Sequence, residues 1–321
     1  MVATRPIQIA GAGLAGCAAA IAARRAGAEV DLYDPARAAK HKVCGEFLTP
    51  EIEPVLKTLG LWDEFLGLGP ARMSRMRLIF DGRAAESRFE TPAYGLSRMA
   101  LDGLLRRAAH DRGARHIAER APADCVIVAH GRRQPSNGDR LFGFKAHFEG
   151  PASEAVELYF FDGGYIGVNP VENGVTNVCG LAMESLLRDV AFDPDRLIDR
   201  LGSRLTLYRR QMDWLTTGPL VYHRTVDPAH FLTGDALQFV DPFTGTGMTI
   251  ALWTGALAGR MVANGELPAR FYRQAEQGLW RQRTTCEWLR RALSMRPSRK
   301  LAPFIPPAWL YSLTRPKLES R

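Results

Sequence analysis

The stretch Ile7-Gln8-Ile9-Ala10-Gly11-Ala12-Gly13-Leu14-Ala15-Gly16 decides the fold of this 321-residue chain. An apolar start, closely spaced glycines and an alanine-rich continuation predict a strand, a tight turn and a helix. A second strand is predicted over residues 28–33, and it ends at Asp34. Glycines let a backbone approach a pyrophosphate, a helix N-terminus attracts its charge, and an acidic residue at this offset binds ribose hydroxyls. The stretch therefore predicts a dinucleotide site.

A second glycine-rich segment lies far along the chain. It consists of an apolar strand ending in Gly234-Asp235, then Pro242-Phe243-Thr244-Gly245-Thr246-Gly247-Met248, then an apolar helix predicted from Thr249 to about residue 263. A simple nicotinamide-binding domain has no use for this element. FAD does, because its ribityl chain needs a carboxylate and its electron-rich N1–C2=O edge suits a second helix N-terminus. The two segments together predict noncovalently bound FAD.

The chain resembles the glutathione-reductase-type FAD oxidoreductases, in the branch of geranylgeranyl reductases, flavin-dependent halogenases and single-component aromatic hydroxylases. The resemblance covers most of residues 5–265, and it includes Lys42-Val43-Cys44-Gly45-Glu46 and Leu96-Ser97-Arg98 with Asp102. It implies that Arg98 lies by the FAD phosphates and that the loop of residues 42–46 passes the flavin ring. Glu46 of this loop is a candidate catalytic residue. Cys44 is expected to be inert packing rather than a redox group.

The predicted fold class is α/β, with a Rossmann-like FAD-binding domain and an interleaved, mostly antiparallel substrate sheet. The FAD-binding domain is assigned residues 1–75, 92–135 and 225–265. The substrate domain is assigned residues 76–91 and 136–224, with alternating, aromatic-rich strands at 141–148, 156–161, 165–168 and 175–181. Hairpin turns are predicted at 162–164 and 172–174, and a helix is predicted over 51–66. Residues 266–321 form a helix and a proline-rich arm that could act as a lid.

Candidate substrate residues lie in the predicted sheet. Lys145 and His147 are two residues apart, so they share one strand face, opposite Phe144, Ala146 and Phe148. That face suits either an acid–base pair at a cavity, with His147 catalytic, or a strand face in contact with solvent.

A segment further along the sheet is also a candidate. Tyr165-Ile166-Gly167-Val168-Asn169-Pro170 resembles the Tyr-x-Trp-x-Phe-Pro segment that lines the cavity of geranylgeranyl reductases. Tyr165 and Pro170 match, whereas Gly167 and Asn169 replace the two aromatic residues. We therefore expect a site that is wider or more polar than a prenyl tunnel.

Two departures from the related enzymes constrain the chemistry. His130-Gly131 stands where the hydroxylases carry an Asp-Gly pair that helps to bind FAD and NAD(P)H. We therefore expect His130 and Gly131 to contact FAD, but no tight NAD(P)H site, and electrons that come from a separate reductase or from the substrate. The halogenases use a lysine soon after the helix that follows the flavin loop, and here no lysine occurs between Lys57 and Lys145. Halogenation is not expected.

Composition agrees with an enzyme of the cytoplasm. Five dispersed cysteines without metal-ligand spacing indicate reduced thiols and no metal site. No apolar run approaches the length of a membrane span. The 42 basic and 34 acidic residues are spread along the chain, which favours a solvated surface, or a preference for an anionic substrate or carrier protein, over nucleic-acid binding.

The sequence thus predicts an FAD-dependent oxidoreductase that oxidises or hydroxylates a hydrophobic or aromatic, polyketide-like biosynthetic intermediate. A first alternative is a C=C reductase similar to geranylgeranyl reductases. A second is an FAD-containing accessory protein that modifies or matures a partner protein. An enclosed pocket would favour an enzyme, and a wide open face with a basic docking patch would favour the accessory protein.

Overall fold

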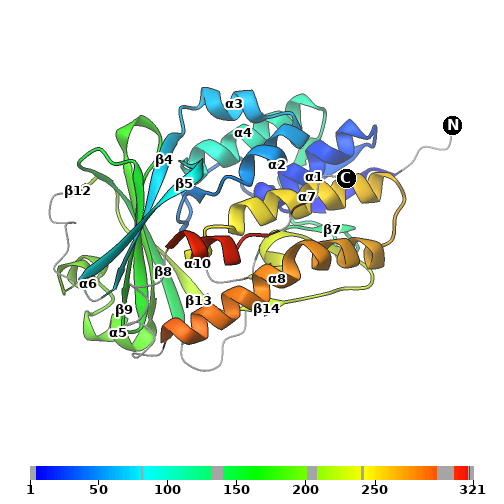
Figure 1. The fold of residues 1–321 in the computed structure, drawn as a ribbon. Coiled ribbons are helices and arrows are strands. Elements are labelled where there is room, and N and C mark those ends of the chain that lie inside the picture. Colours follow the sequence, from blue (N-terminus) through cyan, green and yellow to red (C-terminus); the bar gives the residue numbers. More distant parts are fainter. Residues whose placement is uncertain are drawn as a thin grey trace.

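Two sheets set side by side form the frame of the molecule (Figure 1). The computed structural model describes residues 5–80, 82–131, 140–200, 208–239, 242–294, 307–316 and 318. Helices cover the smaller, parallel sheet, and the larger sheet stands at the other end of the molecule. This is the predicted α/β fold, with a Rossmann-like domain and a mostly antiparallel second sheet.

The parallel sheet has the strand order β15-β7-β1-β2-β6. Its strands are β1 (Ile7–Ala10), β2 (Val30–Tyr33), β6 (Arg115–Ile117), β7 (Ile127–Val128) and β15 (Phe231–Leu232). Helix α1 (Leu14–Arg25) connects β1 to β2, as the first glycine-rich stretch predicts. Between α4 and β7, residues 113–123 form only the short strand β6.

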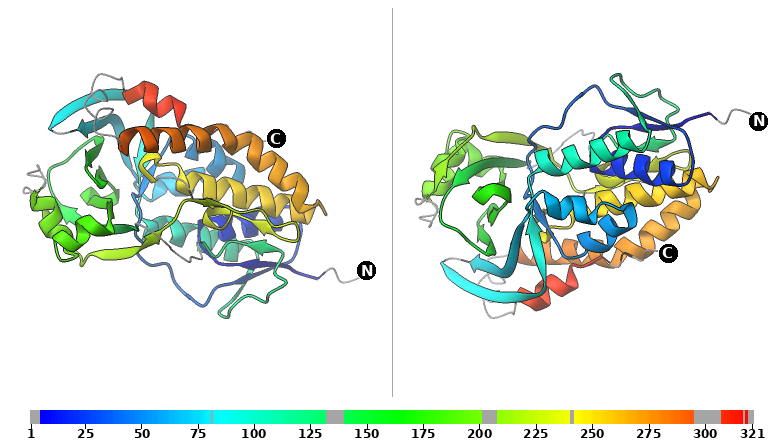
Figure 2. Two further views of the ribbon diagram at one scale, coloured as in Figure 1. Left: turned by 90° about the horizontal axis from the view of Figure 1, so that it is seen from below. Right: turned by 90° about the horizontal axis from the view of Figure 1, so that it is seen from above.

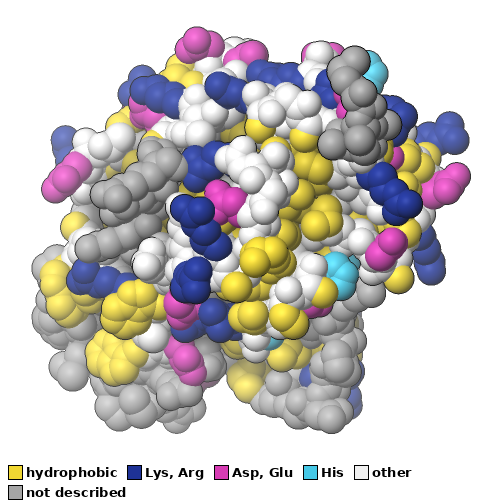
Figure 3. Space-filling view, turned by 90° about the vertical axis from the view of Figure 1, so that its right-hand side faces the viewer, with side chains coloured by type: hydrophobic (Ala, Val, Ile, Leu, Met, Phe, Trp, Pro, Cys, Tyr) yellow, Lys and Arg dark blue, Asp and Glu magenta, His cyan; other side chains and the backbone are white. Residues whose placement is uncertain are grey.

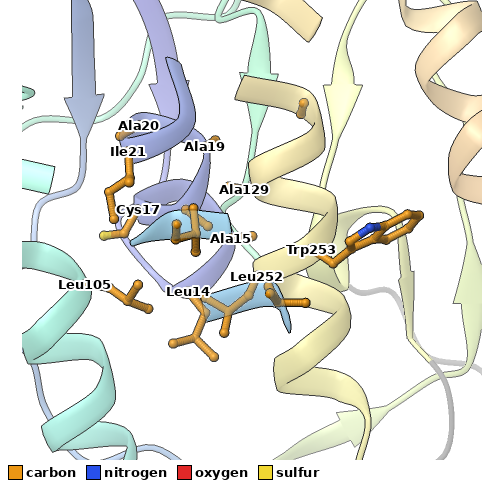
Figure 4. Packing of buried hydrophobic residues seen from close by; sticks show 14 of the residues in the cluster. Leu14, Ala15, Cys17, Ala19, Ala20, Ile21, Leu105, Ala129, Leu252 and Trp253 are labelled. Atoms are coloured by element: carbon orange, nitrogen blue, oxygen red, sulfur yellow. The ribbon is translucent and has the colours of Figure 1, made fainter. Parts of the chain in front are cut away.

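Helix α1 packs between α4 (Arg98–Asp111) and α7 (Gly247–Ala263), and Figure 4 shows this apolar contact. The backbones of α1 and α7 approach closely because α7 has glycines at the crossing. A Cβ on Gly255 would lie 2.1 Å from the Ala15 oxygen, and one on Gly259 would lie 2.1 Å from the Ala19 oxygen. Small residues on both helices are therefore required for this packing.

The larger sheet has the strand order β12-β8-β11-β10-β9-β4-β5-β3, and β13 also pairs with β8. All these pairs are antiparallel except β4 with β9. The strands are β3 (Phe47–Leu48), β4 (Ala71–Phe80), β5 (Arg83–Gly95), β8 (Leu141–Glu149), β9 (Ala155–Phe161), β10 (Gly164–Pro170), β11 (Thr176–Met183), β12 (Arg209–Arg210) and β13 (Leu215–Leu220). The strands predicted at 141–148, 156–161, 165–168 and 175–181 are all present. The β4–β5 hairpin extends on both sides of the predicted segment 76–91.

Several local predictions differ from the structure. The single helix predicted over 51–66 is two helices, α2 (Ile52–Leu59) and α3 (Trp62–Gly67), because Gly60 adopts a left-handed conformation (φ 67°) and ends the first. The turn predicted at 172–174 is the short 3₁₀ helix η1 (Glu172–Gly174). Helix α7 begins at Gly247 rather than at Thr249, which brings its N-terminus closer to the glycine-rich loop.

The remaining elements lie at the edges of the two sheets and at the C-terminus (Figure 2). They are α5 (Glu184–Asp189), α6 (Pro194–Arg200), β14 (His223–Arg224), η3 (Gly234–Ala236), β16 (Gln238–Phe239), η4 (Pro242–Thr244), α8 (Pro268–Ser294) and α10 (Pro307–Leu313). Most of the predicted proline-rich arm, residues 295–306, lies outside the described residues. Among the helices described, none is long and apolar enough to cross a bilayer. On the face shown in Figure 3, basic side chains are interspersed with acidic ones.

Candidate functional site

A cavity of about 1030 Å³ lies where the two sheets meet. One part of its wall follows the carboxyl ends of the parallel strands: Gly11 after β1, Asp34 after β2, Ala129 after β7 and Thr233 after β15. Ligands of open α/β sheets bind at this edge. The other part of the wall comes from the larger sheet and from the C-terminal helices. We refer to the two parts as the nucleotide half and the substrate half.

The glycines of the two predicted motifs have different roles. A Cβ on Gly11 (φ 103°) would lie 2.6 Å from the Ala129 oxygen, and one on Gly16 would lie 1.7 Å from the Gly11 oxygen. These two glycines permit close backbone packing. Gly13 and Gly247 line the cavity. A Cβ on Gly13 would meet only the Lys42 ammonium, at 3.9 Å, and a Cβ on Gly247 would meet no described atom within 4 Å. Their missing side chains leave space for a ligand.

Asp34 is fixed at the cavity edge. Its carboxylate accepts hydrogen bonds from the Ala12 amide (2.9 Å) and the Ala36 amide (2.8 Å), and it pairs with Arg106 at 2.8 Å. A carboxylate has about four lone-pair positions, so it retains capacity for a ribose hydroxyl. Leu14 and Ala15 line the cavity beside Asp34, whereas Ala12 contributes its amide to Asp34 instead.

A small ion-pair network gives the nucleotide half a positive charge. Asp102 is buried, and it pairs with Arg98 at 2.8 Å and with Lys42 at 2.6 Å. Burial acts to raise the pKa of Asp102, but the two cations outweigh it and hold the pKa below its usual value. Arg98 and Lys42 both line the cavity, and Asp102 balances one of their two charges. The net charge complements a pyrophosphate.

The second glycine-rich segment reaches the same cavity. Its lining residues are Gly234, Asp235, Pro242, Thr244, Gly245, Gly247 and Met248, and those of the other predicted cofactor segments are Val43, Cys44, Gly45, His130 and Gly131. Thr246 turns away from the cavity, because its buried hydroxyl pairs with Thr244 and Gln282. The α7 N-terminus and the α1 N-terminus therefore open into one space. This space, with its two glycine gaps and two carboxylates, fits FAD.

Behind the flavin loop lies a buried ionic cluster of Glu46, Lys145 and His147. Glu46 Oε1 is 2.5 Å from Lys145 Nζ, and Oε2 is 2.6 Å from His147 Nε2. The Arg98 amide donates to Oε1 as well, at 2.7 Å. Glu46 and Lys145 are fully buried. The face of β8 that carries Lys145 and His147 therefore meets the flavin loop rather than solvent.

The cluster holds Glu46 in an unusual state. Burial acts to raise the pKa of Glu46, but the His147 hydrogen bond and the Lys145 charge outweigh it, so the pKa lies below its usual value and the side chain is ionised. Its backbone is left-handed (φ 50°), which costs a non-glycine residue about 1–3 kcal/mol. Such strain persists where surrounding contacts fix the conformation. Glu46 thus anchors the flavin loop to β8 and to the start of α4.

His41, which the sequence reasoning missed, joins this cluster at the cavity. Its ring meets that of His147 edge-on, with centroids 5.0 Å apart. Burial, and then the charges of Lys145 and His147, lower the pKa of His41. Glu46 and His41 line the cavity, but Lys145 and His147 do not.

Metal binding at this cluster is a separate question. Ligand atoms of His41, Glu46 and His147 lie within 4.8 Å of one another. The Lys145 ammonium, however, already contacts the carboxylate at 2.5 Å and would repel a divalent cation. The cluster is therefore an ion-pair and hydrogen-bond network, and it does not fit a divalent metal.

The substrate half has a mostly apolar wall. Tyr165, Gly167 and Asn169 line it as the sequence predicts, whereas Pro170 does not; its carbonyl packs against Gly95, where a Cβ would lie 1.8 Å from the oxygen. Sequence reasoning missed most of the remaining wall, namely Met76, Leu78, Phe80, Val156, Leu158, Phe160, Leu220, Gln238, Phe239, Leu289, Tyr311 and Arg315. No motif marks these residues, because strands and helices distant in the sequence bring them together.

Known proteins share this architecture. Residues 6–52 match the family described as Glucose inhibited division protein A. A menaquinone reductase of Mycobacterium tuberculosis (strain ATCC 25618 / H37Rv) is 29% identical over 328 residues, which cover 81% of this chain and 77% of that protein. One from Mycolicibacterium smegmatis (strain ATCC 700084 / mc(2)155) is 26% identical over 319 residues, with 81% and 76% covered.

Solved structures agree on the fold. The flavin-dependent brominase Bmp2 superposes with a TM-score of 0.79 at 17% identity, over 97% of this chain and 93% of that one. The flavin-dependent halogenase CmlS superposes with a TM-score of 0.75 at 17% identity, over 98% and 68%. A flavoprotein/dehydrogenase from Cytophaga hutchinsonii superposes with a TM-score of 0.73 at 18% identity, over 90% and 85%.

The fold and the two-part cavity define the class of this protein. The nucleotide half has the charge, the open glycines and the helix N-termini that FAD requires. The protein is an FAD-dependent oxidoreductase, as the sequence predicts. Which substrate it takes depends on the substrate half.

Proposed function

We propose that the protein reduces an apolar substrate that carries carbonyl oxygens, of the quinone class. The observation that carries this proposal is the composition of the substrate half: an apolar and aromatic wall that contains the polar side chains of Gln238 and Tyr311. The menaquinone reductases support the same choice, because their similarity extends over 81% of this chain. The proposal departs from the oxidation or hydroxylation that the sequence favours and is close to its reductase alternative.

The apolar wall is suited to a flat ring. Phe160 stacks on Phe80 with centroids 4.7 Å apart, and Phe243 lies edge-on to both Phe160 (6.2 Å) and Tyr165 (6.3 Å). All four residues line the cavity. Aromatic rings pack favourably in these offset and edge-on arrangements, so the cluster can take one more ring.

Two polar atoms interrupt this wall. The Gln238 amide nitrogen is buried without a hydrogen-bond partner among the described residues, and the buried Tyr311 hydroxyl has Arg315 beside it. Burial raises the pKa of Tyr311, so its hydroxyl stays protonated and can donate. A buried donor without a partner costs about 1–3 kcal/mol, which a carbonyl oxygen of a substrate would recover.

Bound FAD supplies the hydride that such a reduction needs. The chain positions the substrate, excludes water and supplies a proton. We assign the proton transfer to His41 at the cavity. Glu46, a predicted catalytic residue, lines the cavity too, and His147, the other one, lies behind them. His41 lines the cavity, and its buried Nδ1 has no hydrogen-bond partner among the described residues.

Anaerobic reoxidation tests the proposal. The purified protein should be yellow, and after reduction with dithionite its flavin should be reoxidised by a naphthoquinone with a short isoprenoid side chain. Gln238→Leu and Tyr311→Phe should each raise the KM about tenfold, because each removes one hydrogen bond of about 1.4 kcal/mol. Ser312→Ala, next to Tyr311 on α10 but exposed, is the matched control. Flavin that the quinone cannot reoxidise would contradict the proposal.

Hydroxylation of an aromatic substrate is the second candidate, favoured by the same aromatic cluster. Stopped-flow mixing of the reduced protein with oxygen separates the two reactions. A hydroxylase should form hydroxylated product with oxygen, whereas a reductase should give reduced quinone without it. Halogenation is not proposed, because Lys145, the first lysine after Lys57, is buried against Glu46 and does not line the cavity.

The electron donor remains a prediction from the sequence. His130 lines the cavity, and its Nδ1 lies 2.9 Å from the Gly131 oxygen. We expect no tight NAD(P)H site, so NADH or NADPH should bleach the flavin only slowly under anaerobic conditions. A separate reductase would then supply the electrons.

The cavity favours a small-molecule enzyme over an accessory protein that acts on a protein partner.

A further inference from the structure

Helix α8 has an outer face that carries two exposed tryptophans. The inner face consists of buried residues, Phe271, Tyr272, Ala275, Leu279, Gln282, Cys286 and Leu289. Trp280 and Trp288 lie on the opposite half of the helix, with 53% and 63% of their surface exposed. Figure 1 shows α8 at the edge of the molecule, on the opposite side from α3.

The exposure of these two side chains is unusual. Large aromatic residues are normally mostly buried, and a cluster of exposed ones marks an interaction surface. Tryptophan is enriched where a protein meets the boundary between lipid and water, because its ring is apolar and its N–H is polar. Trp280 and Trp288 are eight residues apart, so they point to similar sides of the helix.

The same outer face is basic. Arg273 and Arg281 are exposed, and neither has a carboxylate within ion-pair distance among the described residues. The nearby Glu276 is already used by Arg224 at 2.5 Å and Arg283 at 2.7 Å. The face thus combines two tryptophans and two arginines without a described ion-pair partner with one exposed carboxylate, Glu287. This is the composition of helices that lie in the interface of anionic membranes.

Helix α8, which carries the outer face, also contributes to the substrate half of the cavity through its inner face. Leu289, the neighbour of Trp288, lines the cavity from α8. On α10, Pro307 and Tyr311 line it too, and Trp309 between them is 53% exposed. Figures 1 and 2 both show α10 near the C-terminal half of α8. Exposed tryptophans therefore stand beside residues of the apolar cavity wall.

We propose that the outer face of α8, defined by Arg273, Trp280, Arg281 and Trp288, docks on an anionic lipid bilayer. Docking would bring the substrate half of the cavity to the membrane, so that a lipid substrate can enter without crossing water. Only this reason for docking rests on the proposed function. The binding itself depends on the tryptophans and arginines.

Vesicle cosedimentation tests the docking. The holoprotein should bind to vesicles that contain phosphatidylcholine and phosphatidylserine, and it should bind much less to vesicles of phosphatidylcholine alone. Trp280→Ser with Trp288→Ser should weaken binding about tenfold or more, because it removes the two interfacial rings. Arg273→Glu with Arg281→Glu should weaken it about tenfold or more as well, because it reverses the charge that attracts anionic lipid. Leu66→Ser on α3 and Arg107→Glu on α4 change exposed residues away from α8 and should have no effect.

The outcomes separate docking from turnover. All variants should keep the flavin absorbance and circular dichroism of the parent, and should reduce quinone dissolved in detergent at the parent rate. Binding that is equal in the α8 variants and the controls would overturn the proposal. So would a stable dimer in sedimentation equilibrium that the tryptophan variant abolishes, because the face would then join two copies. Vesicle binding without quinone reduction would leave docking intact and refute only the proposed substrate.

Discussion

The two halves of the cavity are formed by different parts of the chain, one by backbone and the other by side chains. In the nucleotide half, ligand space comes from backbone: glycine gaps at Gly13 and Gly247 and the N-termini of α1 and α7. In the substrate half it comes from side chains of a sheet, with the buried Glu46 cluster between the two halves. Backbone features depend on short local motifs, whereas the side-chain wall depends on strands that meet only in the folded protein. Substitutions in the two halves should therefore have different effects on folding and on ligand binding.

The largest expected effect compares two glycines of helix α7: Gly255, which is needed for folding, and Gly247, which leaves space for the ligand. Gly255→Val should prevent folding, because its Cβ would lie 2.1 Å from the backbone of α1, which cannot move away. Overpacking commonly costs about 1–3 kcal/mol, and a clash with backbone should cost more. Gly247→Val should fold and lose flavin docking. Soluble yield, circular dichroism and flavin absorbance measure both, and a Gly247→Val protein with normal flavin would show that α7 does not face the ring.

The second effect concerns the cluster between the halves. Lys145→Met should destabilise the protein by about 3–5 kcal/mol, because it leaves a buried carboxylate without its cation. Adding Glu46→Gln should restore part of the loss, since the unpaired charge is then gone. Urea denaturation measures both variants. Arg209→Met breaks an exposed pair with Glu149 and should leave the midpoint unchanged; an equal loss there would remove the distinction between buried and exposed pairs.

The third effect concerns the nucleotide half alone. Asp34→Ala should weaken FAD about tenfold or more, because a ribose hydroxyl and the Ala12 amide each lose a partner, at about 1–3 kcal/mol per group. Asp31→Ala is the control: Asp31 lies in β2, the strand that Asp34 follows, but it pairs with Arg115 and does not line the cavity. Fluorescence titration of the apoprotein with FAD gives both affinities. Equal affinities would place the ribose elsewhere.

The smallest expected effect is a pH dependence. The pKa of His41 lies below its ordinary value of 6.5, so the unfolded chain takes up that proton first as the pH falls. Stability should therefore fall as the pH drops below 6.5. The pKa of Glu46 lies below 4.5, so its contribution is present above 4.5 and is lost as the pH falls further. Denaturation at several pH values should show both steps, and His41→Gln should remove the first. A loss of stability on raising the pH from 5 to 6.5 would contradict this.

The sequence by itself determined strands β1, β2, β7 and β15, the helices α1 and α7, and the choice of FAD as cofactor. Each depends on residues close in the chain: the first glycine stretch with Asp34, and the second with Gly234 and Asp235. A turn that needs glycine, or a helix N-terminus that meets a phosphate, is a local requirement that spacing reveals. Strands β8, β9, β10 and β11 of the larger sheet were also predictable, because alternation is a local pattern.

Only the tertiary structure decided what the substrate half contains. Lys145 and His147 lie 99 and 101 residues from Glu46, and alternation alone left open whether their strand face meets solvent or a cavity. The same holds for Tyr311, which reaches the cavity from the C-terminal helix. Which face of a strand is buried, and which distant side chains share a wall, depends on how separate elements pack. That packing is set by the total shape and burial of the elements, and no short stretch of sequence encodes it.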